Sequence, residues 1–271
     1  MSLSRKQVAL ARSFLFVPGD RPDRFAKASA SGADVVILDL EDAVAGENKG
    51  QARAHVKEWL AAGNDAAVRI NPPGTPWFEA DLAAVIRLGC PVVVPKAESV
   101  PALSDIGRRV ARKCALIPLV ETALGIERAS EVCATAGTVR VALGNADLAS
   151  ELGIAHDDHT ALLHARSRLV FASAAANLAP PIDGVTTSIT DTAVLQDDVA
   201  HARRLGFGGK LCIHPAQVAS VESGFAPTEA EQDWAQRVVE AGDSVTQING
   251  QMIDKPLLER ARRILATKDG Q

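Results

Sequence analysis

The stretch DVVILDLED, residues 34–42, decides the fold class of this chain. Its aliphatic residues form a nearly continuous run instead of alternating with polar ones, which is typical of a parallel strand buried on both faces. The run ends in Asp39, Glu41 and Asp42. A strand of this kind predicts an α/β protein in which helices cover a parallel sheet.

Seven further runs of the same kind lie along the chain, and stretches long enough for a crossover helix separate them. They are SFLFVPG from Ser13, AVRINPP from Ala67, PVVVPKAE from Pro91, ALIPLVET from Ala115, VRVALGNAD from Val139, IDGVTTS from Ile182 and KLCIHPAQ from Lys210. Eight strand-then-helix units use almost all of the 271 residues. We therefore predict a single (β/α)8 TIM barrel with an extra C-terminal helix.

An open doubly wound sheet is the alternative fold, but the chain has neither a GxGxxG fingerprint after its first strand nor a GxxxxGK[ST] phosphate loop. Helix boundary signals agree with the barrel, since Thr228 and Glu231 form a capping box and Gly206 fits a helix stop. We expect residues 1–245 to form the catalytic barrel. Residues 246–271 are expected to form a helical extension, beginning near Pro256, that packs on the barrel or on a neighbouring subunit.

The composition argues against several classes of partner. A formal net charge of -4 gives no electrostatic reason to expect nucleic acid or an anionic membrane. No apolar stretch approaches the roughly 20 residues needed to cross a bilayer, and the amino terminus does not resemble a signal peptide. The four cysteines form no CxxC pair, which is typical of reduced, buried thiols in a cytoplasmic protein.

Polar residues collect at the ends of five consecutive predicted strands, which is where the active site of such a barrel lies. They are Asp39, Glu41 and Asp42, then Arg69 and Asn71, then Lys96 and Glu98, then Glu121, and then Asn145 and Asp147. A single acid after a strand is more often a helix cap, and Asp42 fits that interpretation equally well. Five strand ends in a row are harder to explain as caps.

Carboxylates crowded at one mouth repel one another unless a cation neutralises them. Their oxygen atoms suit a hard ion such as Mg²⁺, which usually takes one or two carboxylates and keeps positions for water and substrate. Glu121 and Asp147, at the tips of neighbouring strands, are the predicted metal pair.

The same segments resemble the citrate lyase beta-subunit (CitE-like) and malyl-CoA lyase family, within the HpcH/HpaI aldolase superfamily. The similarity lies in RSFLFVPGDRP, ILDLEDAV, the RIN around Arg69, PKAE, the VET ending in Thr122, GNADLASELG, GGKLCIHPAQV and MIDKP, in this order and spacing. The family often carries an acid just before the metal-binding Asp, where this chain has Ala146, which leaves the subfamily open.

This resemblance implies that Glu121 and Asp147 bind Mg²⁺ and that Arg69 contacts the substrate. Asp39 and Glu41 would support the water shell of the metal or the adjacent cations, and Lys96 would help to hold negative charge. Glu121 and Arg12 are further predicted substrate contacts.

Asp254 has two interpretations. By similarity it would reach the active site of a neighbouring subunit as an acid or base, and the alternative is a cap just before Pro256. The family suggests homotrimers or hexamers.

The resemblance implies a Mg²⁺-dependent carbon–carbon lyase. It would cleave a β-hydroxyacyl-CoA thioester of the citryl-, malyl- or citramalyl-CoA type into acetyl-CoA and a 2-oxo acid, or form the thioester from these two compounds. Two alternatives are open: a beta subunit that acts only with the partner subunits of a citrate lyase complex, and a Schiff-base aldolase using Lys96.

Overall fold

A computed structural model of the chain describes residues 3–110, 114–241, 246–248 and 251–266. The chain divides into two compact units, Met1–Phe225 and Ala226–Gln271. None of the helices in these described ranges combines the length and the hydropathy that crossing a bilayer requires.

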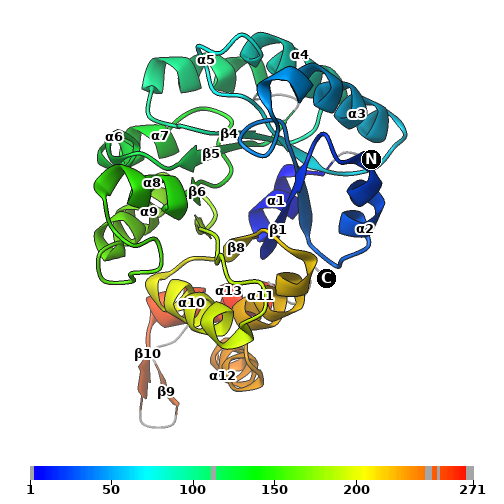
Figure 1. The fold of residues 1–271 in the computed structure, drawn as a ribbon. Coiled ribbons are helices and arrows are strands. Elements are labelled where there is room, and N and C mark those ends of the chain that lie inside the picture. Colours follow the sequence, from blue (N-terminus) through cyan, green and yellow to red (C-terminus); the bar gives the residue numbers. More distant parts are fainter. Residues whose placement is uncertain (1–2, 111–113, 242–245, 249–250, 267–271) are drawn as a thin grey trace. The chain divides into compact units, whose positions relative to one another are not determined.

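The first unit contains a closed barrel of eight parallel strands, in which each strand pairs with the next along the chain and β8 pairs with β1 (Figure 1). The strands are β1 (Ser13–Pro18), β2 (Val35–Asp39), β3 (Ala67–Arg69), β4 (Val92–Val94), β5 (Leu116–Val120), β6 (Ala142–Leu143), β7 (Ile182–Asp183) and β8 (Gly209–Cys212). All of them lie at the predicted runs, so the prediction of a (β/α)8 barrel is confirmed.

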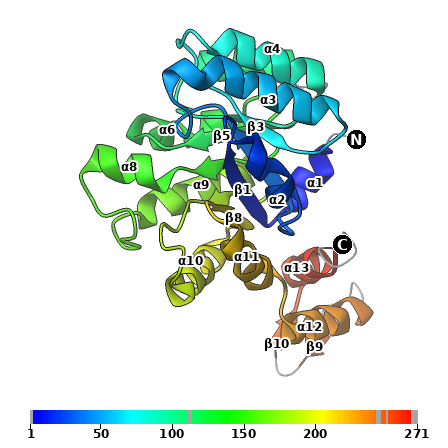
Figure 2. The ribbon, with the colours of Figure 1, turned by 45° about the vertical axis from the view of Figure 1, so that its right-hand side comes forward.

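Helices follow the strands and cover the outside of the barrel (Figure 2). They are α2 (Phe25–Ser29), α3 (Lys49–Ala61), α4 (Phe78–Leu88), α5 (Val100–Val110), α6 (Ala123–Glu127), α7 (Ala129–Cys133), α8 (Asn145–Leu152), α9 (Leu163–Ala175), α10 (Thr192–Leu205) and α11 (Val218–Phe225). Short 3-10 turns are η1 (Pro22–Arg24), η2 (Gly46–Asn48) and η3 (Pro215–Gln217). The predicted stop at Gly206 ends α10, because its φ of 104° is left-handed.

Alternation along the strands sorts the core into two layers. Phe14, Ile37 and Ile117 belong to the cluster that fills the barrel, whereas Leu15 and Val36 pack toward the surrounding helices. The first helix, α1 (Arg5–Leu10), adds Val8 to the inner cluster. This closes the end of the barrel where the strands begin, so a ligand must approach from the end where the strands finish.

The second unit has its own small core. Helices α12 (Glu229–Glu240) and α13 (Lys255–Ala266) pack through Ala235, Val238, Leu258 and Ala261, and β9 (Thr246–Ile248) pairs with β10 (Gln251–Ile253). The expected capping box at Thr228 is present.

The boundary predicted between residues 245 and 246 falls beside residues 242–245, which lie outside the described ones. The second unit begins earlier, at Ala226, because α12 packs with α13. Packing of this extension on the barrel or on a neighbouring subunit stays a prediction.

Candidate active site

Asp39 and Arg69 form a bidentate ion pair at the ends of β2 and β3, where they are also partners in the strand ladder. Nε and Nη2 of Arg69 donate to the two carboxylate oxygens at 2.7 and 2.6 Å. Asp39 also accepts hydrogen bonds from the backbone N–H groups of Glu41 and Ala43. Burial lowers the pKa of Arg69, but the hydrogen bonds and the charge of Asp39 raise it well above its ordinary value. The guanidinium is therefore a fixed positive charge.

Glu41 lies against the same guanidinium on its other side. Its Oε2 is 3.1 Å from Nη1 of Arg69, without the geometry of a hydrogen bond. Burial raises the pKa of Glu41 to about 8, although the charge of Arg69 opposes this shift. Asp42 is 3.8 Å from Arg69 and its side chain is exposed. Arg69 therefore lies within 4 Å of three carboxyl groups, of which Asp39 binds it through two hydrogen bonds.

Glu121, Lys96 and Asp147 form a second group. Glu121 and Lys96 follow the ends of β5 and β4, and Asp147 lies in the first turn of α8, after β6. The side chain of Glu121 is 1% exposed, and its Oε1 accepts the backbone N–H of Lys96 at 2.8 Å. The Lys96 ammonium lies 3.6 Å from this oxygen and 3.3 Å from Oδ1 of Asp147. Burial raises the pKa of Glu121 to about 7, against the opposing effects of Lys96. One cation thus reaches both predicted metal ligands.

Gly144 makes room for Glu121. It precedes α8, and a Cβ added there would lie 2.4 Å from Cβ and 2.6 Å from Oε2 of Glu121. Real Cβ atoms do not approach other atoms so closely. The glycine of the GNAD segment is therefore required by packing, because the buried carboxylate passes directly over its Cα.

A cavity of about 420 Å³ opens between these groups. Its polar lining residues are Asp39, Asp42, Arg69, Glu121, Asn145 and Asp147, and its apolar ones include Phe16, Leu119, Leu143, Val185, Leu211 and Ile213. Arg69 also lies over the ring of Phe16, with its guanidinium carbon 4.7 Å from the ring centroid. The cavity suits a small acid that carries an apolar portion.

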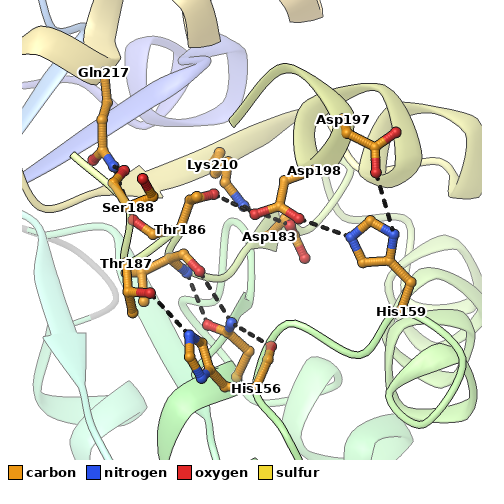
Figure 3. A network of polar contacts seen from close by, with 12 residues as sticks. His156, His159, Asp183, Thr186, Thr187, Ser188, Asp197, Asp198, Lys210 and Gln217 are labelled. Carbon is orange, nitrogen blue, oxygen red and sulfur yellow. Dashed lines mark hydrogen bonds and ion pairs between the residues drawn. The ribbon is translucent and has the colours of Figure 1, made fainter. Parts of the chain in front are cut away.

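Asn145 fixes the loop that carries Val185 to this cavity. Its Oδ1 accepts the Val185 N–H at 2.8 Å, and its Nδ2 donates to the carbonyls of Val185 and His156. Figure 3 shows the same loop held further along, where Gln217 donates to the carbonyls of Thr186 and Ser188. Val185, part of the apolar lining of the cavity, is thereby hydrogen-bonded to Asn145, the first residue of α8 and two positions before Asp147.

A buried ionic cluster lies behind this loop, between β7, β8, α9 and α10. Asp183 is fully buried and accepts hydrogen bonds from Arg166 and Lys210, each at 2.9 Å (Figure 3 shows the Lys210 side). Lys210 is also 3.9 Å from Asp198, which pairs with His159 at 2.7 Å. Sequence reasoning missed this cluster, because Asp183 and Lys210 read as isolated polar residues within apolar strands.

The donor set at the mouth fits Mg²⁺. The part of the chain that the structure describes has no group of three or more His, Cys, Asp or Glu placed to hold a metal ion. Mg²⁺ does not need one, since it is usually held by one or two carboxylates with water and substrate oxygens completing its octahedron. Glu121 and Asp147 remain the predicted pair, and the ammonium of Lys96, which lies near both, marks a position where a cation is electrostatically favoured.

The mouth brings together eight of the ten polar residues predicted at the strand ends, which are Asp39, Glu41, Asp42, Arg69, Lys96, Glu121, Asn145 and Asp147. Asn71 does not join them, because β3 ends at Arg69 and the Asn71 side chain turns to Asp81 and the Leu40 carbonyl. Glu98 lies four positions past the end of β4 and does not line the cavity, and its carbonyl accepts a hydrogen bond from Arg128.

Two other predicted residues lie elsewhere. Arg12 precedes β1, where its carbonyl accepts the Lys210 N–H and its own N–H donates to Asp34. These backbone contacts lie where β1 begins, at the end of the barrel opposite this mouth, and a substrate contact at Arg12 stays a prediction. Asp254 belongs to the second unit, where its exposed carboxylate accepts the Leu257 N–H as a cap of α13.

Residues 12–215 match the family model of HpcH/HpaI aldolase/citrate lyase. This chain belongs to that family. A citrate lyase subunit beta-like protein of Deinococcus radiodurans is 35% identical over 277 residues, covering 95% of this chain and 97% of the relative. A (3S)-malyl-CoA thioesterase of Cereibacter sphaeroides is 32% identical over 267 residues, covering 94% and 93%.

A solved structure of a similar protein agrees with this assignment. CitE from Mycobacterium tuberculosis, in complex with magnesium, acetoacetate and coenzyme A, has a TM-score of 0.81 and 35% identity, and the match covers 96% of this chain and 99% of that one. The predicted family is confirmed, and the prediction of a lyase with Mg²⁺ as cofactor is confirmed at the level of that family.

Proposed function

We propose that this chain is a Mg²⁺-dependent carbon–carbon lyase that splits a β-hydroxyacyl-CoA thioester into acetyl-CoA and a 2-oxo acid, or joins them. The observation that carries the proposal is the convergence of Glu121 and Asp147 on one cation position, beside the fixed guanidinium of Arg69. The complex of the related CitE with magnesium, acetoacetate and coenzyme A supports this choice of ligands.

Cleavage of such a thioester leaves a 2-oxo acid and a thioester enolate, so negative charge must be stabilised on both fragments. Mg²⁺ held by Glu121 and Asp147 would supply a Lewis acid for the carboxylate and hydroxyl oxygens of the 2-oxo acid portion. Arg69 lines the same cavity and would stabilise the enolate oxygen. Asp39 acts through Arg69, because its two hydrogen bonds hold the guanidinium in one plane.

A proton must leave the substrate hydroxyl and another must reach the enolate carbon. We propose Asp254 of a neighbouring subunit for this step in a homotrimer or hexamer. An exposed carboxylate at the start of α13 is compatible with such a contact, although the observed hydrogen bond to Leu257 also serves as a cap. Light scattering with the full chain tests the oligomer that this step requires.

A Schiff base at Lys96 is disfavoured by its surroundings. Burial lowers the pKa of Lys96, but the charges of Glu121, Asp147 and Glu41 outweigh it and raise the pKa overall. An amine that forms a Schiff base at neutral pH needs the opposite shift. Borohydride trapping of substrate on Lys96, with activity that survives EDTA, would support this alternative against the metal mechanism.

The purified chain should be assayed with citramalyl-CoA, malyl-CoA and citryl-CoA, with Mg²⁺ and with EDTA. Mg²⁺-dependent release of acetyl-CoA and a 2-oxo acid is the expected result. Release of free CoA with an intact hydroxy acid would instead assign the hydrolysis after which the Cereibacter relative is named. No turnover by folded protein would support a beta subunit that needs citrate lyase partners. We propose a cytoplasmic location, because its four cysteines are buried and form no CxxC pair, as in proteins of a reducing compartment.

A further inference from the structure

Lys96 has an unusual backbone conformation at the centre of the site. Its φ is 50°, in the left-handed region, where a residue with a Cβ is strained. The Glu121 carboxylate accepts the Lys96 N–H at 2.8 Å, and the Lys96 carbonyl accepts the Glu98 N–H at 2.8 Å. A strained residue is held here by the side chain of a predicted metal ligand.

The side chain of Lys96 returns to the same carboxylate. Its ammonium lies 3.6 Å from Oε1 of Glu121 and 3.3 Å from Oδ1 of Asp147, so it spans the two groups that would hold the metal. The left-handed turn makes this possible, because it directs both the backbone N–H and the long side chain toward Glu121. Glu121 is buried beside the negative charge of Asp147, and without Lys96 the more distant charge of Arg69 would have to compensate both burial and that repulsion.

We infer that Lys96 is a built-in counter-ion that occupies the cation position between Glu121 and Asp147 in the metal-free protein and must be displaced when Mg²⁺ binds. The inference rests on the proposed metal site and deepens it. Lys96 is thus a positioning residue: it keeps the two carboxylates together without metal, and it competes with the metal for them.

The Lys96 ammonium has room to move away from the two carboxylates when Mg²⁺ binds. The Lys96 side chain is 37% exposed and that of Asp147 is 45% exposed, whereas that of Glu121 is 1% exposed. The ammonium can therefore swing into the mouth while Glu121 stays in place. In that position it provides positive charge at the cavity entrance.

The first test measures Mg²⁺ binding by isothermal titration calorimetry on the full chain. Lys96→Met keeps the length of the side chain and removes its charge, and it should bind Mg²⁺ about tenfold more tightly than the wild type. Lys96→Arg keeps a cation and should bind Mg²⁺ no more tightly than the wild type. Lys57→Met, at an exposed position of α3, removes the same charge elsewhere and should leave the affinity unchanged.

Thermal melting gives a second readout that a general electrostatic effect would not produce. Lys96→Met should lower the melting temperature of the EDTA-treated protein, because Glu121 loses its counter-ion. Saturating Mg²⁺ should restore the melting temperature to that of the metal-loaded wild type.

A third measurement needs no variant. Acetylation of the wild type by an N-hydroxysuccinimide ester, followed by peptide mass spectrometry, should label Lys96 faster with Mg²⁺ than with EDTA, while Lys57 is labelled equally. Slower or unchanged labelling of Lys96 with Mg²⁺ would overturn the inference.

The outcomes separate this inference from the proposed function. If Glu121→Gln abolishes Mg²⁺ binding but Lys96→Met binds no more tightly than the wild type, the metal site stands and the role of Lys96 is refuted. If the wild type and Glu121→Gln bind Mg²⁺ equally, or neither binds it, the proposed metal site fails and the inference fails with it.

Discussion

Arg69 meets Asp39 with two parallel hydrogen bonds across β2 and β3, and both side chains are almost fully buried, 11% and 1% exposed. The same two-bond geometry occurs on the surface, where Arg21 pairs with Asp23 and the side chains are 45% and 60% exposed. The chain therefore contains the same ion-pair geometry once in a buried position and once in an exposed position. Comparing substitutions at the two positions separates the role of the ion pair in the reaction from its contribution to stability.

Replacing Arg69 should affect activity and stability in different proportions. Arg69→Lys keeps the charge but cannot make the two parallel bonds, so we expect kcat/KM to fall by about a hundredfold, an amount typical of losing one oxyanion donor, with a modest loss of stability. Arg69→Met leaves the buried Asp39 carboxylate without its cationic partner and should cost about 3–5 kcal/mol of unfolding free energy. Steady-state kinetics and urea unfolding measure the two effects.

The surface pair supplies the control for this comparison. Arg21→Lys should change the unfolding free energy by no more than about 0.5 kcal/mol and leave kcat/KM unchanged, because exposed ion pairs contribute little. If Arg69→Lys and Arg21→Lys change kcat/KM equally, the Asp39–Arg69 pair has no specific role in the reaction.

The close approach of Gly144 to Glu121 predicts a second selective effect. Gly144→Ala introduces a Cβ where 2.4 Å separates it from Cβ of Glu121, so the carboxylate must move and Mg²⁺ binding should weaken at least about tenfold. Calorimetric titration with Mg²⁺ measures this loss.

Gly50 offers a matched substitution within α3. A Cβ there meets no atom within 4 Å, so Gly50→Ala should stabilise the protein by about 0.5–1 kcal/mol through helix propensity, without changing Mg²⁺ affinity. Unaltered Mg²⁺ binding by Gly144→Ala would show that Glu121 is not a metal ligand.

The sequence allowed the barrel to be predicted strand by strand, because each strand is a local run of apolar residues. It also located the mouth, since residues just after parallel strands meet at one end. Position at a strand end was not sufficient past the last paired residue: β3 ends at Arg69, and the Asn71 side chain donates to Asp81 instead of facing the cavity. Side-chain direction beyond a strand depends on the loop that follows.

Other features depend on contacts between distant residues and leave little local signal. Asp183 on β7 pairs with Arg166 on α9 and Lys210 on β8. Nothing in the sequence around Asp183 or Lys210 indicates which residue is its partner. The left-handed turn at Lys96 is likewise held by Glu121, 25 residues away. Gly144 of the GNAD segment is visible in the sequence. Only the structure shows why a glycine is needed there, because the Glu121 side chain lies where a Cβ would be.

Removing Mg²⁺ should lower stability in a way that depends on Glu121. A ligand that binds only the folded state at 100 times its Kd adds about 2.7 kcal/mol, so the melting temperature of the wild type should rise with Mg²⁺ and fall back with EDTA. Glu121→Gln should show no such rise. Glu151→Gln is the matched control, because Glu151 also accepts a backbone N–H, that of Ala123 at 2.9 Å, on an exposed surface. If Glu151→Gln loses the Mg²⁺ effect and Glu121→Gln keeps it, the proposed ligand is wrong.

Asp183 should govern part of the stability at acid pH. Burial raises the pKa of its carboxyl, but Lys210 and Arg166 outweigh burial and hold the pKa below its ordinary value. A carboxyl with a lowered folded pKa contributes stability that is fully present above its unfolded pKa, about 3.9. That stability is lost as the pH falls through the folded pKa. Asp183→Asn should therefore cost about 3–5 kcal/mol at pH 7, because two buried cations lose their partner.

The difference between wild type and Asp183→Asn should shrink as the pH is lowered from 5 toward 3, since the unfolded wild type takes up a proton that the folded carboxylate does not bind. Urea unfolding followed by circular dichroism at each pH measures it. Asp157→Asn, at an exposed position in the loop between α8 and α9, should stay within about 0.5 kcal/mol of the wild type throughout. A difference between wild type and Asp183→Asn that is constant from pH 7 to pH 3 would mean that Asp183 stabilises the barrel through packing and not through its charge.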